Sequence, residues 1–236
     1  MQIQVGSLEV EEYPRTVYIR QHELLEHLNS DHERTRVYWS SAQFEVLDPE
    51  LMRQGLSDPC WEVRRNFVRK WNVHGHGMDV AFMGLDDPHP EVREEWAHKL
   101  LEDYRLHEAL SPYKVQGASD SCVGVAYVWI KNYDDFPSKM IEAGLQNPDR
   151  SLRFLWSQKR FTPTAEQVER GLSDPDASIR YIWAKRHDYI PLPHQIQRGL
   201  LDTDHNVREV WEKKAVESLY HKTLDTSEME ETILSI

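Results

Sequence analysis

The sequence predicts an all-α protein, a right-handed α-solenoid of about seven helical-hairpin repeats of 27–33 residues. Three observations carry this prediction: one pattern recurs along the chain, a tryptophan recurs at one position of it, and an arginine recurs three residues earlier. A fixed period of this length is typical of solenoids, because each unit is too small to bury its own apolar face and stacks on its neighbours.

The pattern is clearest in GLSDPDASIRYIWAKR, residues 171–186, and it matches the chain without gaps at seven starting points. Six of the eight tryptophans fall on the same phase, twelve residues after a start. The starts are residues 27, 55, 84, 117, 144, 171 and 199, and the twelfth positions hold Trp39, Phe67, Trp96, Trp129, Trp156, Trp183 and Trp211.

The first helix of a repeat is expected in FTPTAEQVERGL, residues 161–172. Thr164 followed by Gln167 predicts a capping box, which satisfies free amides at a helix start. Gly171 near the end of this helix suits a C-terminal cap or a close approach of the backbone to a neighbour. Leu172 is expected to point into the interior.

The second helix is expected to begin at Asp174-Pro175, with Asp as the N-cap and Pro at the first helical position. Ile179 and Trp183 are four residues apart and therefore share one face, which predicts a buried stripe. Pro191 and Pro193 end this helix before the next unit. The same start signal recurs as Asp58-Pro59, Asp87-Pro88 and Asn147-Pro148, and without proline at Asp120 and Asp202.

These units resemble the HEAT-like and leucine-rich-repeat-variant α-solenoids in SDPDASIRYIWAK, DDPHPEVREEWAH and NPDRSLRFLWSQK, over residues 18–216. The resemblance implies stacked helical hairpins joined by Asp–Arg pairs. Two departures are the length of the units and the Trp at a position where a smaller residue is usual. The variant-repeat family includes a member with an iron–sulfur cluster, but Cys60 and Cys122 cannot supply the four thiolates such a cluster takes. We expect no cofactor.

The repeats leave two flanking segments, an N-terminal arm over residues 1–17 and a capping helix or acidic tail over residues 217–236. The fourth unit is irregular: the tryptophan spacing before it stretches to 33 residues, Ala126 replaces the recurring arginine, and Gly124 stands at a helical position. This predicts a longer first helix or an inserted loop, in a unit that has drifted rather than one that acts as a hinge.

Composition narrows the function classes. The formal net charge of −12 argues against nucleic-acid affinity over the whole surface, although a local basic groove remains open. No run approaches the ~20 apolar residues of a membrane span, and the acidic start lacks the features of a signal peptide. These features predict a cytoplasmic, soluble protein without membrane contact. No catalytic motif or evident small-molecule site is present, so we expect no enzyme.

The recurring arginines, called here the arginine row, have two readings. Each guanidinium could pair with a capping Asp of the same or the next unit, or the row could form a cationic strip that binds nucleic acid with basic residues near the helix ends. Those late lysines also suit the negative end of a helix dipole. The row is Arg36, Arg64, Arg93, Arg153, Arg180 and Arg208, and the late basic residues are Lys70, Lys99, Lys159, Lys185, Arg186, Lys213 and Lys214.

The in-phase tryptophans are expected in the core, or alternatively as aromatic platforms on a concave face. Trp61 and Trp71 lie off that phase and are the better candidates for exposed anchors. His74 and His76 could bind a metal, but two histidines without a placed carboxylate or thiolate make a weak site. A glycine-rich loop between repeats is the favoured interpretation of that stretch.

The function predicted is that of a non-catalytic binding protein, which recognises another macromolecule, most readily a protein, through the solenoid surface. One version is an acidic inhibitor that occupies the basic site of a nucleic-acid-binding protein. The alternatives are nucleic-acid binding along the arginine row and, below it, a HEAT-like DNA glycosylase.

Overall fold

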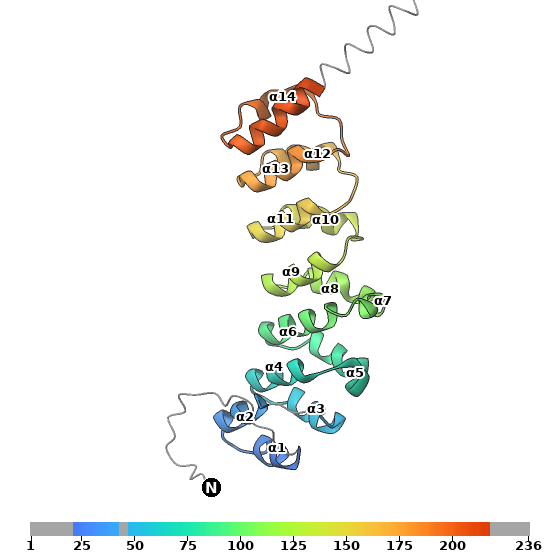
Figure 1. Cartoon of the computed structure of the whole chain (residues 1–236), viewed down its shortest axis with the longest axis vertical. Helices are drawn as coiled ribbons and strands as arrows, with labels where there is room; N and C mark the ends of the chain where they lie inside the picture. The colour runs from blue at the N-terminus through green and yellow to red at the C-terminus, as the bar shows by residue number, and fades with distance from the viewer. Residues whose placement is uncertain (1–20, 43–46, 218–236) are drawn as a thin grey trace, which may run out of the picture. The chain divides into compact units, whose positions relative to one another are not determined.

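A computed structural model describes residues 21–42 and 47–217 (Figure 1). Every regular element in these ranges is helical, which confirms the all-α prediction. The chain divides into two compact units, residues 1–129 and residues 130–236. The predicted N-terminal arm, and all but residue 217 of the predicted C-terminal segment, lie outside the described residues.

The first unit is built from helices that pack in consecutive pairs, and each pair packs against the next. The pairs are α1 (Gln21–Leu28) with α2 (Glu33–Ser40), α3 (Pro49–Leu56) with α4 (Trp61–Lys70), and α5 (Val73–Leu85) with α6 (Pro90–Leu101). α9 (Val123–Asn132) follows them and runs across the boundary between the units. The α4 helix packs on both α2 and α6.

The stretched repeat holds short helical turns between α6 and α9 in place of one longer first helix. They are η1 (Tyr104–Leu106), α7 (His107–Leu110), η2 (Ser111–Tyr113) and α8 (Lys114–Ala118). Pro112 lies in the third of these turns, η2, where it interrupts continuous α-helical hydrogen bonding. The insertion is therefore ordered helical structure.

The second unit repeats the same hairpin more regularly. Its labelled helices are α10 (Ser138–Leu145), α11 (Arg150–Gln158), α12 (Ala165–Leu172), α13 (Ala177–Lys185) and α14 (Pro193–Leu200), and a further helix covers residues 205–217. First helices pack on first helices, since α10 contacts α12 and α12 contacts α14; the second helices α11 and α13 also lie side by side (Figure 1).

The predicted capping box at the start of α12 is confirmed. Thr164 accepts from the backbone amide of Gln167, and Gln167 accepts in return from the backbone amide of Thr164. The predicted start of the second helix is wrong by two residues. Asp176, not Asp174, is the N-cap of α13, and it accepts from the amides of Ser178 and Ile179. The Asp-Pro pair forms the turn before the helix, because Asp174 bonds the amide of Asp176 and Arg153.

In every described repeat after the first, an aromatic ring of the core packs directly on a glycine of the preceding helix. A Cβ placed on Gly171 would overlap the ring of Trp183, and the same is true of each start glycine and the aromatic twelve residues later. Gly171 therefore serves close approach, as the sequence allowed, whereas the residue that caps α12 is Ser173. The first repeat has no glycine here, and His27 instead stacks on Trp39 at 3.9 Å between ring centroids.

Burial confirms the core assignment of the tryptophan row. Trp96, Trp129, Trp156, Trp183 and Trp211 are at most 2% exposed, Phe67 is fully buried, and Trp39 is half-buried. Ile179 and Leu172 are buried as predicted. Within the described ranges, no helix has the length and apolar character that crossing a membrane requires.

Candidate functional site

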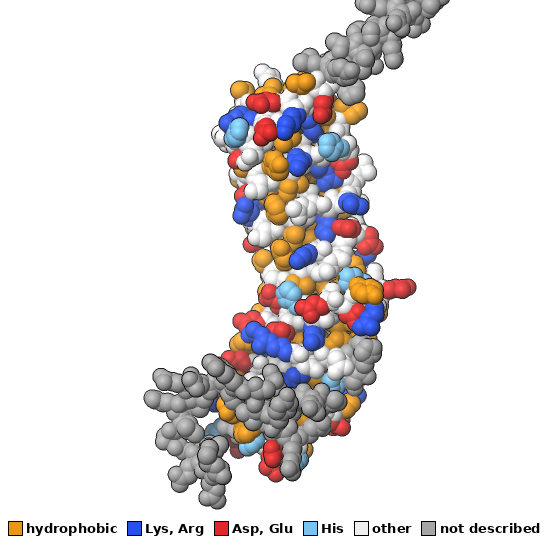
Figure 2. Space-filling view, viewed as in Figure 1, with side chains coloured by type: hydrophobic (Ala, Val, Ile, Leu, Met, Phe, Trp, Pro, Cys, Tyr) orange, Lys and Arg blue, Asp and Glu red, His pale blue; other side chains and the backbone are white. Residues whose placement is uncertain are grey.

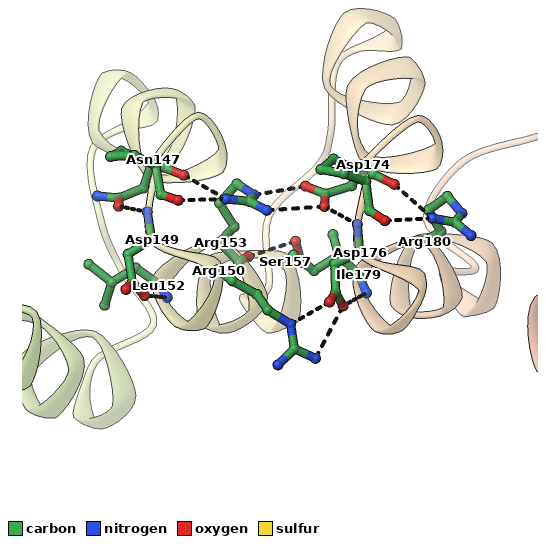
Figure 3. Close-up of polar contacts among 12 residues, drawn as sticks. Asn147, Asp149, Arg150, Leu152, Arg153, Ser157, Asp174, Asp176, Ile179 and Arg180 are labelled. Atoms are coloured by element: carbon green, nitrogen blue, oxygen red, sulfur yellow. Dashed lines mark hydrogen bonds and ion pairs between the residues drawn. The ribbon is translucent and has the colours of Figure 1, made fainter. Parts of the chain in front are cut away.

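The arginine row joins successive hairpins, and Arg153 shows how (Figure 3). Its Nε donates to Asp174 Oδ2 at 2.9 Å and its Nη2 to Asp174 Oδ1 at 3.3 Å. Its Nη1 donates to the carbonyl oxygens of Asn147 (3.0 Å) and Pro148 (3.1 Å) in its own hairpin. One guanidinium therefore fixes its own turn and grips the turn of the next hairpin.

The same geometry recurs wherever the described chain has both partners. In each case the carboxylate comes from the following repeat, which resolves the alternative that the sequence left open. The Nε–Oδ2 distances are 2.9 Å for Arg36–Asp58, 2.7 Å for Arg64–Asp87, 2.7 Å for Arg93–Asp120 and 2.8 Å for Arg180–Asp202. These arginines are hydrogen-bonded between repeats, so the structure does not place them as a free cationic strip.

The electrostatics of these pairs match their geometry. The side chains of Arg180 and Asp202 are only 14% and 11% exposed. The hydrogen bond to Asp202 raises the pKa of Arg180, and the hydrogen bond from Arg180 lowers the pKa of Asp202. Asp202 also accepts from the amide of Asp204. Both groups are held in their charged forms, and the pair behaves as a structural tie.

Arg208, the last member of the arginine row, differs from the others. Its Nη1 donates to the carbonyl oxygens of Asp202 and Thr203 as in the other repeats. Among the residues that the structure describes, no carboxylate is bonded to its Nε or Nη2. Within the described residues, Arg208 therefore makes the hydrogen bonds to its own turn but not the bonds to a carboxylate of a following repeat.

A second basic row reaches from one hairpin to the backbone of the preceding one. Lys214 Nζ donates to the carbonyl of Arg186 at 2.7 Å, and Arg186 in turn donates to the carbonyls of Ser157 and Lys159. Lys70 bonds the carbonyl of Ser40 in the same way. Carbonyls at a helix C-terminus carry partial negative charge, so these late basic residues are used much as the helix-dipole reading expects.

Burial shifts the pKa of Lys70. It lowers the pKa of this lysine from 10.5 to about 8. Lys185 and Lys213, by contrast, are exposed. The predicted basic strip therefore separates into buried ties and a small number of surface lysines.

The two tryptophans that lie off the repeat phase, Trp61 and Trp71, differ in burial. Trp71 is 3% exposed, with its ring edge-on to Trp96 at 5.4 Å and its Nε1 donating to the carbonyl of Gly77. The expectation that Trp71 is exposed is wrong, because the next hairpin covers it. Trp61 is half-buried and stacks on His89 at 4.2 Å between centroids.

The histidine stretch does not form a metal site at His76. Its Nδ1 accepts from the amide of Asn72 at 3.1 Å, and its Nε2 lies 3.1 Å from the carbonyl oxygen of Leu47. Both ring nitrogens are thus engaged in a residue only 4% exposed. The stretch opens α5 and contains Gly77, whose φ of 73° breaks the helix there. The expected loop is therefore a broken helix start; the side chain of His74 lies outside the described residues.

One group of possible metal ligands was not predicted. Glu33, Cys60 and Glu62 bring ligand atoms within 4.8 Å of one another. The Cys60 thiol donates to Glu62 Oε2 at 3.6 Å, and two hard carboxylates with one soft thiol do not form a donor set that selects a particular metal. We assign no metal to it. The chain's two cysteines also cannot supply a four-thiolate cluster.

Four residues of α11 and α13 take no part in these ties and are called here the aromatic face: Phe154, Gln158, Tyr181 and Lys185. Phe154 and Tyr181 each follow an arginine of the row, so they hold the same position on two packed helices. Both are half-buried, whereas Gln158 and Lys185 one turn later are exposed. The Lys185 ammonium lies 5.2 Å from the centroid of the Tyr181 ring.

The corresponding position in the first unit holds residues of several kinds, among them Arg65, Glu94 and Tyr127, and Tyr127 is 38% exposed. Arg65 there donates to Glu91 at 3.1 Å and to Glu95 at 3.2 Å, and Arg69 also pairs with Glu95 at 2.9 Å. That surface is an ion-pair network whose charges satisfy one another. The aromatic face as defined lies in the second unit, although Tyr127 of α9 holds the same repeat position in the first unit. The spacing of one repeat between Phe154 and Tyr181 could have revealed the aromatic face in the sequence.

Charge is distributed unevenly along the chain. Lys and Arg balance Asp and Glu over residues 130–217, so the acidic surplus belongs to residues outside that range, chiefly 1–129. On the face of the second unit seen in Figure 2, acidic and basic side chains are interspersed with hydrophobic ones. The aromatic face is therefore not set in a strongly acidic surface.

A hollow of about 560 Å³ in the first unit is lined by Trp71, Lys99, Tyr104 and Arg105, among others. Arg105 is paired with Asp103 at 2.6 Å.

Comparison of the chain with protein-family models and with curated proteins finds no match. The geometry of the chain itself is therefore the basis for a functional assignment.

Proposed function

We propose that the chain is an α-solenoid of seven helical hairpins, of the HEAT-like or leucine-rich-repeat-variant kind, and that it is a non-catalytic protein that binds another protein. The observation that carries the proposal is that the repeated basic side chains are used in contacts between hairpins, whereas the repeated aromatic side chains Phe154 and Tyr181 are not. The arginine row and most late basic residues tie hairpins together, and the aromatic face remains for a partner.

The chemistry of the aromatic face favours a protein partner. Aromatic side chains give a large contact area at a small entropic cost, and they are enriched among residues that dominate protein interfaces. Lys185 beside Tyr181 adds a positive charge that can meet a carboxylate. On the following loop Ile190 is 90% exposed and Leu192 48% exposed, which extends the apolar surface of this unit.

Nucleic-acid binding along the arginine row is less favoured by this arrangement. A phosphate would have to displace a carboxylate that already makes two hydrogen bonds to each guanidinium, as in Arg180–Asp202. The acidic-inhibitor version requires unpaired carboxylates, whereas the recurring Asp58, Asp87 and Asp120 are bonded to arginine. Neither version uses the aromatic face.

Affinity capture with the full chain as bait tests the proposal. Phe154→Ala combined with Tyr181→Ala should abolish capture of a discrete partner, and Glu166→Ala should leave it intact. Glu166 is a matched control because it is exposed on α12 of the same unit, outside the aromatic face. Equal capture by all variants would refute the assigned surface. Salt-sensitive retardation of DNA that is lost in Arg153→Gln would favour the nucleic-acid alternative.

A further inference from the structure

Ion pairs of the first unit show which positions of neighbouring hairpins meet on the surface of the second helices. Arg65 of α4 donates to Glu91 at 3.1 Å and to Glu95 at 3.2 Å, both on α6 of the following hairpin. The residue ten after the start of one repeat therefore lies beside the residues seven and eleven after the start of the next. The same relation applies in the second unit, because α11 and α13 pack on each other as α4 and α6 do.

This relation extends the aromatic face into a strip of apolar side chains that crosses three helices. Phe154 of α11 lies beside Ile182 of α13, and Tyr181 of α13 lies beside Val210 of the helix over residues 205–217. All four side chains are half-buried, so each of them keeps part of its surface open to a partner. These four residues are called here the apolar strip.

The two edges of the apolar strip differ in charge. About one turn before it, the residues of successive hairpins are uncharged: Ser151, Ser178 and Asn206. About one turn after it, one repeat position is exposed in four successive hairpins and is mostly basic: Lys131, Gln158, Lys185 and Lys213. A partner with carboxylates along one edge is therefore matched in one orientation and not in the reverse one.

Two of these lysines border the strip directly. The Lys185 ammonium lies 5.2 Å from the centroid of the Tyr181 ring, and the residue is exposed. Lys213 pairs with Glu209 at 2.8 Å but remains 70% exposed, and it is close enough to Tyr181 to interact with it electrostatically. An exposed ion pair of this kind contributes little to stability. A carboxylate of a partner can therefore share Lys213 with Glu209 or replace it.

The spacing of the strip favours a helical occupant. Packed helices lie about 8–10 Å apart, so Phe154 and Tyr181 offer one apolar contact at each such interval. Residues on one side of a β-strand recur every ~6.6–6.8 Å, whereas seven residues of an α-helix rise by about 10.5 Å. A helix that crosses α11 and α13 comes closer to this spacing, and it can place one apolar residue and one carboxylate on each hairpin.

We infer that the partner segment bound by the aromatic face is an amphipathic α-helix with carboxylates along one edge. Its apolar side lies on the apolar strip, and its carboxylates face Lys185 and Lys213. The partner chemistry rests on the proposed function, because it specifies what the same surface binds. Local charge selects this partner against the charge of the whole chain, which is −12 and repels acidic molecules at long range.

Fluorescence anisotropy with two labelled model peptides tests the inference on the full chain. Each peptide has three heptads, with leucine at the first and fourth positions, a charged residue at the fifth, and alanine or glutamine elsewhere. The charged residue is glutamate in one peptide and lysine in the other. The glutamate peptide should bind and the lysine peptide should not, although the net charge of the chain alone would favour the lysine peptide.

Charge reversal beside the strip provides a matched pair of variants. Lys185→Glu should weaken binding of the glutamate peptide about fivefold, and the effect should shrink as salt is added. Lys139→Glu makes the same change at an exposed position of α10, outside the strip, and should leave binding unaltered. Thermal melting followed by circular dichroism checks that both variants are folded.

The outcomes separate the partner chemistry from the proposed function. Equal binding of the two peptides, or binding of the glutamate peptide that Lys185→Glu leaves unchanged, would overturn the inference. If neither peptide binds while capture of a natural partner still depends on Phe154 and Tyr181, the inference fails and the proposed function stands. Capture that is independent of these two aromatic residues would refute the proposed function itself. Binding of single-stranded oligothymidine that Lys185→Glu abolishes would overturn the inference in favour of nucleic acid.

Discussion

Replacing Gly171 with alanine probes the contact between glycine and aromatic ring that recurs in every described repeat after the first. The added Cβ would overlap the ring of Trp183, which is fully buried and cannot move outward. Overpacking of this kind costs about 1–3 kcal/mol. Alanine is favoured over glycine inside a helix by about 0.5–1 kcal/mol, which offsets part of that cost. We expect the free energy of unfolding to fall by about 1–2 kcal/mol when both effects are combined.

Urea denaturation followed by circular dichroism measures this change, and the chain contains its own control. Gly124 is also helical, but the three atoms nearest to a Cβ there all belong to the carboxylate of Glu94, the flexible end of a half-buried side chain. Gly124→Ala should therefore be neutral or stabilising. If Gly171→Ala were as stable as wild type, the ring would not be seated on the glycine and the packing argument would fail.

Four further predictions follow from the junctions. Ser157→Ala should lower the free energy of unfolding by about 1–3 kcal/mol, because the buried Trp183 Nε1 then loses its acceptor at 3.0 Å. In the Ser157→Ala variant, Trp183→Phe should lower the free energy of unfolding by less than it does in the wild type. Arg180→Lys should cost about 1.5–3 kcal/mol in the same denaturation assay, because an ammonium cannot make the bidentate contact; an unchanged midpoint would contradict the pair's structural role. The pKa of Asp202 is lowered by Arg180, so its contribution to stability is present above the unfolded pKa of about 3.9 and is lost as pH falls through the folded pKa; the stability curves of wild type and Asp202→Asn should converge in acid. The pKa of Lys70 is lowered to about 8, so the unfolded chain binds more protons between pH 8 and 10.5 and stability should rise with pH there; Lys70→Met should flatten that rise in a pH series.

Local signals in the sequence predicted the helices and their core faces well. The spacing of Ile179 and Trp183 gave the buried stripe of α13, and Thr164 with Gln167 gave the start of α12. The Asp-Pro signal was misleading by two residues, because Asp174 accepts from Arg153 of the preceding hairpin and leaves capping to Asp176. An ion pair between repeats cannot be read from one repeat alone.

The candidate binding residues were harder to predict because their roles depend on the neighbouring hairpin. Trp71 lies off the tryptophan phase, yet the ring of Trp96 covers it. The direction of the Arg–Asp pairs was open until the carboxylate was seen to come from the following repeat. Phe154 and Tyr181 hold the same repeat position, but they were not predicted because an aromatic residue beside a core stripe is not by itself a sign of a binding surface.

Successive hairpins of the second unit are joined by equivalent contacts, as in Arg153–Asp174 and Arg180–Asp202, so one hairpin can in principle replace another. Excising residues 171–198 would bring Gly199 to the place of Gly171 and present Asp202 to Arg153, so the Arg–Asp pair and the contact between glycine and tryptophan would re-form across the new junction. A gene that duplicates or loses one such stretch would yield a chain of different length with matching surfaces at the join. Growth by whole units therefore needs no compensating change elsewhere in this unit.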